Sequence, residues 1–401
     1  MQHVSERKLA TRLNKIQVPS FKELGDLAMH YQAVDLGSGK PDYPTEEKFK
    51  EAAIDAIQRD CNQYAPTMGL KSLRQGIATR IAAKWNVSFD FETEITVCSG
   101  VTESLTAAFL ALLDPGDEVI ILSPAFASYQ GGILLAGGKP IYVDLIEPDF
   151  HLNIAKVAAA ITPKTKAILF NSPHNPSGRI FTREETEAVA QLVRDYDLFV
   201  ITDEIYDDFY YQAEPPLPIW TLPGLREKTI LTNGFSKVYA VTGWRLGYVI
   251  APPIITKEIR KVHQYLTLSS ALPFQISMVE ALQVKASYYE KLRVDYKRRL
   301  SILTDAFEEL KIPYVKPDGG YFVLADFSRF GIADDWDFAR YLIETVGLAA
   351  RPLSGFYFDD QVRETGRVWL RFAFCMKESV LQEAVVRLKK LEQVKGEARY
   401  D

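Results

Sequence analysis

The most informative stretch of this chain, the one that most narrows its possible folds and functions, is Asn233-Gly-Phe-Ser-Lys-Val-Tyr-Ala-Val-Thr-Gly-Trp-Arg-Leu-Gly-Tyr248. It places Lys237 just beyond the short apolar run Thr229–Thr232, with Ser236 beside it and Arg245 further on. A neighbouring cation and partial desolvation both disfavour the ammonium, so the amine becomes available as a nucleophile. A hydroxyl and a guanidinium are groups that hold a phosphate. The combination suggests a Schiff base with pyridoxal phosphate; the alternative is a surface loop with an ordinary lysine.

Two acidic residues end a second apolar run, Leu198-Phe-Val-Ile-Thr-Asp-Glu-Ile-Tyr206. A continuous run of this length predicts a buried parallel strand. Asp203 and Glu204 then lie where ligands bind in open α/β sheets. A buried carboxylate needs a partner, and a protonated pyridine nitrogen is one; the carboxylate keeps the ring protonated and therefore an electron sink. A helix N-cap explains either residue alone about as well.

Two further apolar runs each carry one informative polar side chain. In Ala167-Ile-Leu-Phe-Asn-Ser-Pro-His-Asn-Pro-Ser-Gly178, prolines after Ser172 and Asn175 allow cis peptide bonds. Such a turn would aim the Asn175 amide at a ring oxygen, although ordinary βα loops have the same composition. In Val368-Trp-Leu-Arg-Phe-Ala-Phe374, Arg371 is suited to gripping a carboxylate with two parallel hydrogen bonds. By itself, this last run is more typical of an edge strand with a solvated arginine.

Together these stretches resemble the class I aminotransferases of the pyridoxal-phosphate fold-type-I group. The resemblance runs from about Val34 to about Leu388, and its Ser-Lys…Gly-Trp-Arg-Leu-Gly and Asn-Pro-Ser-Gly motifs are specific in combination. Methionine and aromatic (kynurenine-type) aminotransferases are most similar, in Arg260–Thr267, Tyr64-Ala-Pro and Ser172–Pro176. The resemblance implies an α/β fold: a large domain with a mostly parallel seven-stranded sheet, and a smaller α+β domain.

The resemblance also implies how the ring of the cofactor, pyridoxal 5′-phosphate, is held. Lys237 corresponds to the Schiff-base lysine and Asp203 to the partner of the ring nitrogen. Tyr206 and Asn175 correspond to the two groups at the ring oxygen. Phe126 corresponds to the aromatic side chain stacked on the ring, an arrangement that adds about 1 kcal/mol beyond area burial. Composition alone favours plain core for Phe126.

The phosphate is expected at the start of the helical run that follows Cys98-Ser-Gly. Small residues let the backbone close on an anion there, and the helix dipole favours negative charge. The expected amides are those of Gly100, Val101 and Thr102. Arg245 would supply the charged contact. Many relatives have serine where this chain has Gly234, so either Ser236 replaces that hydroxyl or the phosphate loses one contact.

Substrate and partner contacts are likewise implied by the resemblance. Arg371 corresponds to the arginine that binds the substrate carboxylate, helped by the backbone near Gly39. Tyr43 is a candidate for the side-chain pocket, or an ordinary turn residue. Tyr64 corresponds to a tyrosine donated by the neighbouring subunit, which implies a homodimer with shared active sites.

The expected activity is transfer of an α-amino group from a neutral donor to a 2-oxo acid: methionine, phenylalanine, tyrosine, kynurenine or glutamine. The segment Tyr265–Gln275, where some aspartate-specific relatives carry an extra cation, contains no Arg or Lys. An aspartate-type aminotransferase or a carbon–sulfur β-lyase remains an alternative, since both use the same lysine, aspartate and arginine. A cofactor-binding regulator is a remote alternative, because it would need a DNA-binding module for which the chain has no spare domain.

Bulk properties fit this reading. The chain has 401 residues and a net charge of −5, and its spread positive charge argues against nucleic-acid binding. No apolar run reaches membrane-spanning length, and the N-terminus lacks the apolar core of a signal peptide, so a cytoplasmic protein is expected. Three dispersed cysteines make no disulfide framework, and the five histidines show no metal-ligand spacing. His174, near the expected site, is predicted to have a surface or supporting role.

Strand-like runs alternate with helical runs, which predicts a parallel α/β sheet. The seven strands expected in it are Ile95–Val97, Glu118–Leu122, Pro140–Val143, Ala167–Asn171, Phe199–Asp203, Thr229–Thr232 and Leu246–Ile250. We expect an arm over residues 1–45 that packs on the small domain, a large domain over 46–275 and a small domain over 276–401. The pattern from Phe274 to Leu310 predicts one extended helix between the domains. The small domain is expected to hold strands in Gly319–Asp326 and Trp369–Phe374 and helices over Trp336–Thr345 and Glu378–Leu391.

Overall fold

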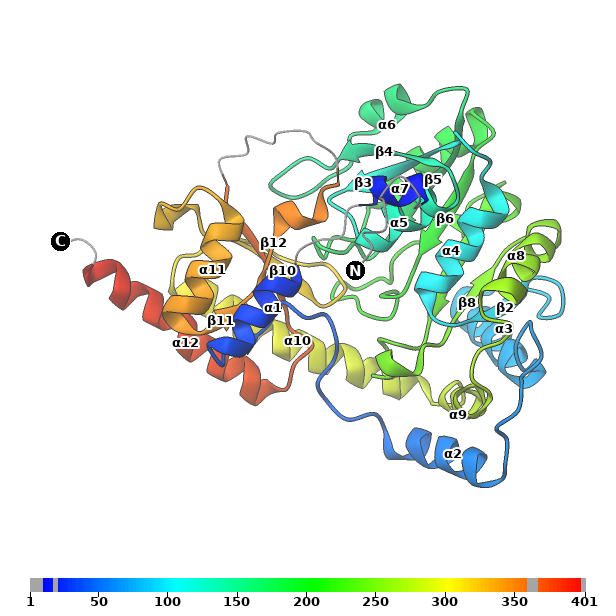
Figure 1. The fold of residues 1–401 in the computed structure, drawn as a ribbon, viewed down its shortest axis with the longest axis horizontal. Coiled ribbons are helices and arrows are strands. Elements are labelled where there is room, and N and C mark those ends of the chain that lie inside the picture. Colours follow the sequence, from blue (N-terminus) through cyan, green and yellow to red (C-terminus); the bar gives the residue numbers. More distant parts are fainter. Residues whose placement is uncertain (1–9, 17–20, 359–366, 398–401) are drawn as a thin grey trace, which may run out of the picture.

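The computed structural model describes residues 10–16, 21–358 and 367–397. It shows two parts that lie next to each other, a large one around a seven-stranded sheet and a small one around a four-stranded sheet (Figure 1). No helix in the described part of the chain combines the length and the apolar character needed to cross a membrane.

All seven predicted strands of the large sheet are confirmed. In spatial order they are β2 (Ile95–Cys98), β8 (Gly247–Ile250), β7 (Thr229–Gly234), β6 (Phe199–Asp203), β5 (Thr165–Asn171), β3 (Glu118–Ser123) and β4 (Lys139–Asp144). Strand β8 pairs antiparallel with both of its neighbours, and the other pairings are parallel. The parallel strands therefore bring their carboxyl ends to one edge of the sheet, where ligands bind in folds of this kind.

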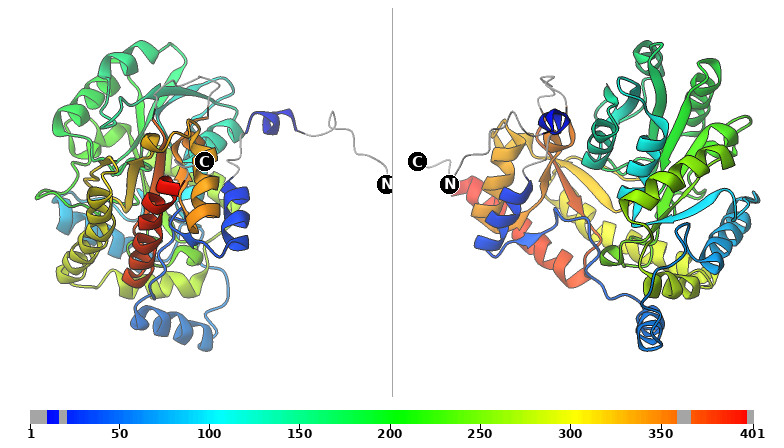
Figure 2. Two further views of the ribbon diagram at one scale, coloured as in Figure 1. Left: turned by 90° about the vertical axis from the view of Figure 1, so that its left-hand side faces the viewer. Right: turned by 45° about the vertical axis from the view of Figure 1, so that its right-hand side comes forward.

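Apolar side chains fill both faces of this sheet because alternate residues of a strand point to opposite sides. Along β3, Val119 and Ile121 pack towards α4 (Val101–Leu112), α5 (Ala127–Leu135) and α8 (Pro253–Leu266). Ile120 and Leu122 pack on the other face, towards α6 (Ile154–Ala160) and α7 (Arg183–Asp195). The two helical layers are visible in Figure 2. The uninterrupted apolar runs of the sequence are thus strands buried from both sides.

The small part is built on an antiparallel sheet in the order β12 (Arg351–Pro352), β13 (Trp369–Ala373), β10 (Phe322–Asp326) and β9 (Tyr314–Val315). The predicted helices are present as α11 (Asp335–Val346) and α12 (Glu378–Glu397). Near the N-terminus, β1 (Val34–Asp35) pairs in parallel with β11 (Leu348–Ala349), and α1 (Phe21–His30) lies next to α11. The division of the chain at residues 45 and 275 stays a prediction.

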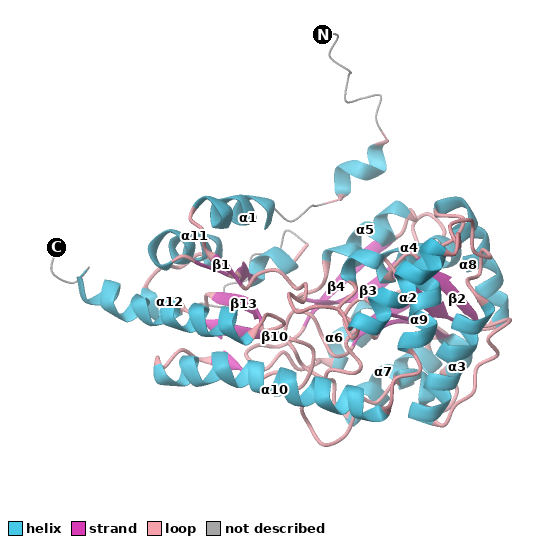
Figure 3. Cartoon of the chain, turned by 90° about the horizontal axis from the view of Figure 1, so that it is seen from below, coloured by secondary structure: helices cyan, strands magenta, loops and turns pink. Residues whose placement is uncertain are grey.

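The single extended helix predicted from Phe274 to Leu310 is wrong. Two helices occupy this region, α9 (Leu272–Ala281) and α10 (Ala286–Glu309), separated by a turn. Neither glycine nor proline marks the break in the sequence. The turn places Leu282 over Gly76 of α3 (Lys71–Trp85), where an added Cβ would lie 2.9 Å from Leu282 Cδ1. Tertiary packing therefore overrides local helix propensity at this point, and α10 continues to run beside α12 (Figure 3).

Candidate active site

A cavity of about 340 Å³ lies at the carboxyl ends of the large-sheet strands and reaches the small sheet through Phe322 and Arg371. It brings together most of the predicted site residues. Those that line it are Gly39, Val101, Thr102, Phe126, Asn175, Asp203, Tyr206, Ser236, Lys237, Arg245 and Arg371. Residues separated by more than 300 positions in the sequence therefore share one cavity.

Lys237 follows β7 in the turn that ends this strand, and its Nζ donates to the carbonyl oxygen of Gly39 over 3.3 Å. Burial lowers the pKa of its ammonium below the usual range, and the nearby cations Arg245 and Arg371 act in the same direction. The opposing effects of Cys375 and Asp203 are outweighed. The site thus makes the amine form more accessible than in an exposed lysine, and this is the form that reacts with an aldehyde or accepts a proton.

Asp203 ends β6 and is 5% exposed. Its Oδ2 accepts a hydrogen bond from the Tyr129 hydroxyl over 2.8 Å, and its Oδ1 accepts one from the Ile205 amide over 3.2 Å. Burial raises the pKa of the carboxyl to about 6, against the lowering effect of these two donors and of Lys237. A carboxylate held this way gains from a positively charged partner in the cavity, which is what a protonated ring nitrogen supplies.

The helix N-cap alternative for Asp203 and Glu204 is wrong, because turns rather than a helix follow β6. Glu204 does not line the cavity; its Oε1 accepts from the Trp220 ring N–H over 3.0 Å. Sequence reasoning missed Tyr129, which lies one helical turn after Phe126 in α5. Residues at i and i+3 share a helix face, and that spacing is the signal that would have found it.

Arg371 is 6% exposed and lies on β13, which pairs on both sides, so the edge-strand interpretation is wrong. Its Nη1 donates to Asn175 Oδ1 over 2.8 Å and its Nη2 donates to the Gly37 carbonyl over 2.9 Å. The rings of Phe322 and Phe356 lie 4.0 and 4.6 Å from the guanidinium carbon. Burial lowers the pKa of this guanidinium to about 10.

The remaining nitrogen of the same guanidinium, Nε of Arg371, is buried and has no hydrogen-bond partner within residues 10–16, 21–358 and 367–397. Two aromatic rings and two hydrogen-bond acceptors therefore fix the plane of the Arg371 guanidinium, while its Nε–H donor stays unsatisfied. Such an arrangement fits a carboxylate ligand, which accepts from arginine in the plane of the guanidinium.

Asn175 belongs to the turn after β5, and both cis peptide bonds that the sequence allows, Ser172–Pro173 and Asn175–Pro176, are present. The Asn171 side chain ties this turn to β6, because its Oδ1 accepts from the Asn175 amide and its Nδ2 donates to the Asp203 carbonyl. Since Asn175 Oδ1 already accepts from Arg371, its side-chain amide offers the cavity a donor, as an oxygen ligand requires.

The opposite end of the cavity fits a phosphate. Gly100 precedes α4 with a φ of 88°, and the first helical residues, Val101 and Thr102, line the cavity. A Cβ at Gly100 would lie 2.4 Å from Nη2 of Arg245, so only glycine lets this guanidinium lie against the turn. Ser236 also lines the cavity. Helix amides, a guanidinium and hydroxyls form a combination that binds phosphate.

The replacement of serine by Gly234 has a packing reason. A Cβ at Gly234 would lie 3.0 Å from both Gly247 Cα and the Leu246 carbonyl oxygen. A Cβ at Gly247 would in turn lie 2.8 Å from the Val101 amide nitrogen. Two facing glycines therefore hold β7 and β8 close under the phosphate end, and Ser236 is the hydroxyl that remains nearby.

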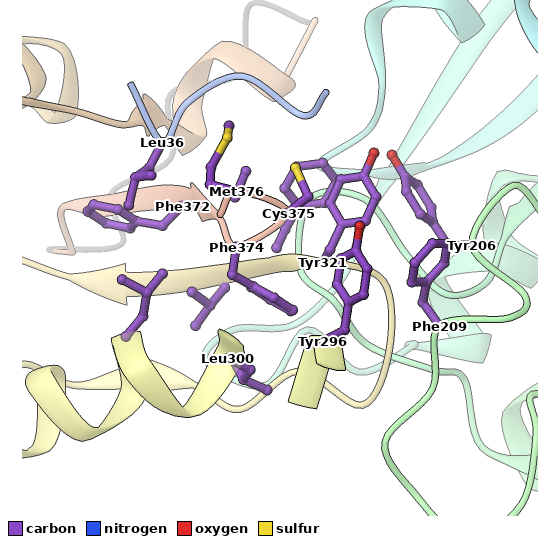
Figure 4. Close-up of a cluster of buried hydrophobic side chains, with 14 of the residues drawn as sticks. Leu36, Tyr206, Phe209, Tyr296, Leu300, Tyr321, Phe372, Phe374, Cys375 and Met376 are labelled. Carbon is purple, nitrogen blue, oxygen red and sulfur yellow. The ribbon is translucent and has the colours of Figure 1, made fainter. Parts of the chain in front are cut away.

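Tyr206, which lines the cavity, belongs to a cluster of aromatic side chains with Phe209, Tyr296 and Tyr321 (Figure 4). The Tyr206 and Tyr321 rings meet edge to face with centroids 5.0 Å apart, and the Tyr321 hydroxyl donates to the Gly39 carbonyl over 2.7 Å. Burial raises the pKa of Tyr206 above its usual range. Phe126, by contrast, is 40% exposed and lines the cavity, so the plain-core interpretation of this side chain is wrong.

Three residues differ from expectation or lie outside the cavity. Tyr43 does not line it: its hydroxyl hydrogen-bonds that of Tyr296 over 2.8 Å, beside a separate hollow of about 110 Å³. Tyr64 also lies outside this cavity, and its side chain is 80% exposed. Such exposure is compatible with the expected contact to a neighbouring subunit. His174 is buried and bonds the Ser177 hydroxyl, which excludes the surface role.

One histidine does meet potential metal ligands. Cys98, Glu103 and His263 bring ligand atoms within 4.8 Å of one another, although His263 is far from the other two in sequence. Hydrogen bonds account for the carboxylate, whose oxygens accept from the Ser99 amide and contact His263 Nδ1. The group therefore braces the turn before α4, and its geometry is explained without a metal.

Comparisons with known proteins agree with this geometry. Residues 31–388 match the family model "Aminotransferase class I and II". The chain is 34% identical over 381 residues to methionine aminotransferase of Escherichia coli, covering 95% of this chain and 98% of that protein. It is 32% identical to the kynurenine–oxoglutarate transaminase of Dictyostelium discoideum, covering 92% and 93%.

A solved structure is similarly close. N-succinyldiaminopimelate aminotransferase from Mycobacterium tuberculosis superimposes with a TM-score of 0.91 at 34% identity, covering 95% of this chain and 99% of that one. Fold, family model and relatives agree, and the chain therefore belongs to the class I and II aminotransferases, a family of pyridoxal-phosphate-dependent transaminases.

Proposed function

We propose that this protein binds pyridoxal 5′-phosphate and moves the α-amino group of a neutral, sulfur-containing or aromatic amino acid to a 2-oxo acid. One observation carries the proposal: the amine of Lys237, the carboxylate of Asp203 and the guanidinium of Arg371 line the same cavity. Lys237 follows β7, Asp203 ends β6 and Arg371 lies in the middle of β13, and each provides a group that transamination requires.

The lining residues fit the cofactor from end to end. Residues 100–102, Ser236 and Arg245 would hold the phosphate, and Asp203 would face the ring nitrogen. Asn175 and Tyr206 would donate to the ring oxygen, and Phe126, exposed towards the cavity, would cover one face of the ring. When bound, pyridoxal phosphate supplies the aldehyde that takes up the amino group and a ring that delocalises the electron pair left when the Cα–H bond breaks.

The protein's own groups orient the substrate and move its proton. Arg371 binds the substrate carboxylate through the guanidinium that Asn175 and Gly37 hold in place. This fixes the direction of the Cα–H bond relative to Lys237. The Lys237 amine would take the proton from the substrate Cα and return it to the carbon of the cofactor that had carried the aldehyde. The Tyr129 hydroxyl favours the ionised form of Asp203, and Asp203 would keep the ring nitrogen of the bound cofactor protonated.

The donor class rests on the walls of the cavity. Phe126, Tyr206 and Phe322 line it, so beyond their contacts to the ring and to Arg371 they make its walls apolar, which suits an apolar or aromatic substrate side chain. The segment Tyr265–Gln275 carries no Arg or Lys that would demand a second carboxylate. The relatives include methionine and kynurenine transaminases, but also an aspartate aminotransferase and a probable N-succinyldiaminopimelate aminotransferase at similar identity, so the proposed class rests on the cavity and not on their names.

The active form is proposed to be a homodimer with shared sites. Tyr64 is 80% exposed, Tyr265 is 88% exposed, and Phe126 is 40% exposed at the cavity. Large exposed aromatic side chains are typical of surfaces that another chain covers. Tyr64 of one subunit would then reach the phosphate bound by the other.

The visible absorbance of the purified protein, reconstituted with pyridoxal phosphate and then mixed with methionine, tests the proposal. A band that bleaches with methionine, together with formation of the corresponding 2-oxo acid, is expected. Lys237→Ala should bind the cofactor without turnover. Aspartate exceeding methionine and phenylalanine by orders of magnitude would overturn the donor class. Pyruvate release from a cysteine conjugate without an acceptor would instead identify elimination, and no band at all would refute cofactor binding.

A further inference from the structure

Four cations line the 340 Å³ cavity: Lys40, Lys237, Arg245 and Arg371. The last three are accounted for by amine transfer, phosphate binding and the α-carboxylate. Lys40 has no role in that scheme. We propose that Lys40 binds the distal carboxylate of a dicarboxylic substrate, so that one cavity accepts both a neutral amino acid and an acidic amino acid or 2-oxo acid. This inference rests on the proposed transamination.

The backbone just before Lys40 contacts two groups of the proposed reaction, the guanidinium that binds the α-carboxylate and the amine of Lys237. The Gly37 carbonyl accepts from Arg371, which grips the α-carboxylate. The Gly39 carbonyl accepts from both the Lys237 amine and the Tyr321 hydroxyl. Lys40 is the next residue, so its long side chain starts from an anchored point beside the reacting amine. Because Lys40 itself lines the cavity, its ammonium is available to the side chain of a substrate bound there.

Among the residues that the structure describes, none pairs its carboxylate with the Lys40 ammonium. Within the ranges that the structure describes, no carboxylate lies within 4.0 Å of it. Asp42, two residues away, accepts from the Lys377 backbone amide over 2.5 Å. Asp203, the single acidic residue among those that line the cavity, is committed to Tyr129 and Ile205. The cavity therefore offers an acidic substrate side chain one uncommitted cation.

The exposure of Lys40 explains how the same site would tolerate neutral substrates. A lysine on a flexible four-carbon stem keeps its charge hydrated when no anion is present. It turns inward only when a carboxylate offsets the loss of hydration. A buried arginine in the same place would instead exclude neutral side chains, because its charge would be left unpaired. Since two different substrates use one cavity in turn during transamination, a movable cation resolves the conflict between them.

Substitution of Lys40 separates the two substrate classes. In the reconstituted holoenzyme, Lys40→Met should lower kcat/KM for glutamate and 2-oxoglutarate about ten-fold, chiefly through KM, because one charge-assisted contact is lost. The values for methionine and its 2-oxo acid should stay within about two-fold, since they never meet the ammonium. Lys40→Arg should restore most of the loss. Added salt should weaken glutamate binding in the unsubstituted enzyme more than in Lys40→Met.

Lys377→Met provides the matched control, because Lys377 is exposed, lies close in space and does not line the cavity. It should leave both substrate classes unchanged. Equal losses for both classes in Lys40→Met, or no change in either, would overturn the assignment of Lys40. An unsubstituted enzyme that uses methionine but refuses dicarboxylic substrates would overturn it as well. Failure of every donor in the unsubstituted holoenzyme would instead contradict the transamination itself.

Discussion

The Tyr129 hydroxyl donates to Oδ2 of Asp203 over 2.8 Å, between residues 74 positions apart in the chain. Both side chains are buried. The contact stabilises the ionised carboxylate against the desolvation that raises the pKa of Asp203 to about 6. In the proposed mechanism Tyr129 is therefore a positioning residue, which would act on the cofactor ring through Asp203.

Replacement of Tyr129 by Phe should raise the pKa of Asp203 further, because a donor that favours the charged form is lost. The carboxylate would then be protonated over more of the acid range, and the acid limb of the kcat/KM profile should move to higher pH. At neutral pH, kcat should fall about ten-fold, the value of one buried charge-assisted hydrogen bond. Tyr196→Phe, on the exposed end of α7, is the control. An unshifted acid limb would show that Tyr129 has only a structural role.

Arg371→Lys should fail although it keeps the charge. Lysine cannot reproduce the planar fork that contacts Asn175, Gly37 and a carboxylate at once. We expect kcat/KM to fall about 100-fold or more for every donor, because at least two charge-assisted hydrogen bonds change. The absorbance of the bound cofactor should be unchanged, since Arg371 contacts the substrate end. Steady-state kinetics and an absorbance titration check both parts, and loss of cofactor binding would contradict the assignment.

Gly234→Ser should not improve the phosphate site, although the family resemblance leads us to expect a serine at this position. The new Cβ would meet Gly247 Cα and the Leu246 carbonyl at 3.0 Å and press β7 away from β8. Overpacking of this kind costs about 1–3 kcal/mol. Equilibrium titration with pyridoxal phosphate and thermal unfolding should show weaker binding and a lower Tm.

Ser236→Ala is the companion variant to Gly234→Ser. It removes the remaining hydroxyl without crowding the backbone, so it should weaken cofactor binding while Tm of the cofactor-free protein stays unchanged. Tighter cofactor binding by Gly234→Ser would mean that the two strands separate easily, which would contradict the packing argument.

Glu204 should make stability depend on pH. Burial raises its pKa to about 8, with a smaller contribution from the Asp207 charge. The folded protein thus binds a proton more tightly at this site than the unfolded chain, in which the carboxyl has its ordinary pKa of 4.5. The contribution to stability is complete below the unfolded pKa and is lost as pH rises through about 8. Urea unfolding at acidic and alkaline pH measures it.

Glu204→Gln tests that origin, because glutamine still accepts from the Trp220 ring N–H but does not ionise. The variant should match the original protein at acidic pH and be more stable at alkaline pH. Equal sensitivity to alkaline pH in both proteins would place the titration elsewhere.

Local pattern alone located the seven strands of the large sheet and the residues at their ends. Strands buried on both faces are continuously apolar, and Lys237, Asp203 and Asn175 lie at or just after the ends of such strands. Short stretches of sequence therefore contain both features. The motif around Lys237 also identified the family, because its glycines, hydroxyl and cations are needed together.

Tertiary structure decided what those patterns leave open. Whether β13 lies at an edge or inside its sheet, and so whether Arg371 is solvated or buried between Phe322 and Phe356, depends on strands distant in the sequence. The break before α10 and the hydrogen bond from Tyr129 depend equally on distant partners. Burial periodicity is a property of a few consecutive residues, whereas the choice of partner is a property of the packed chain.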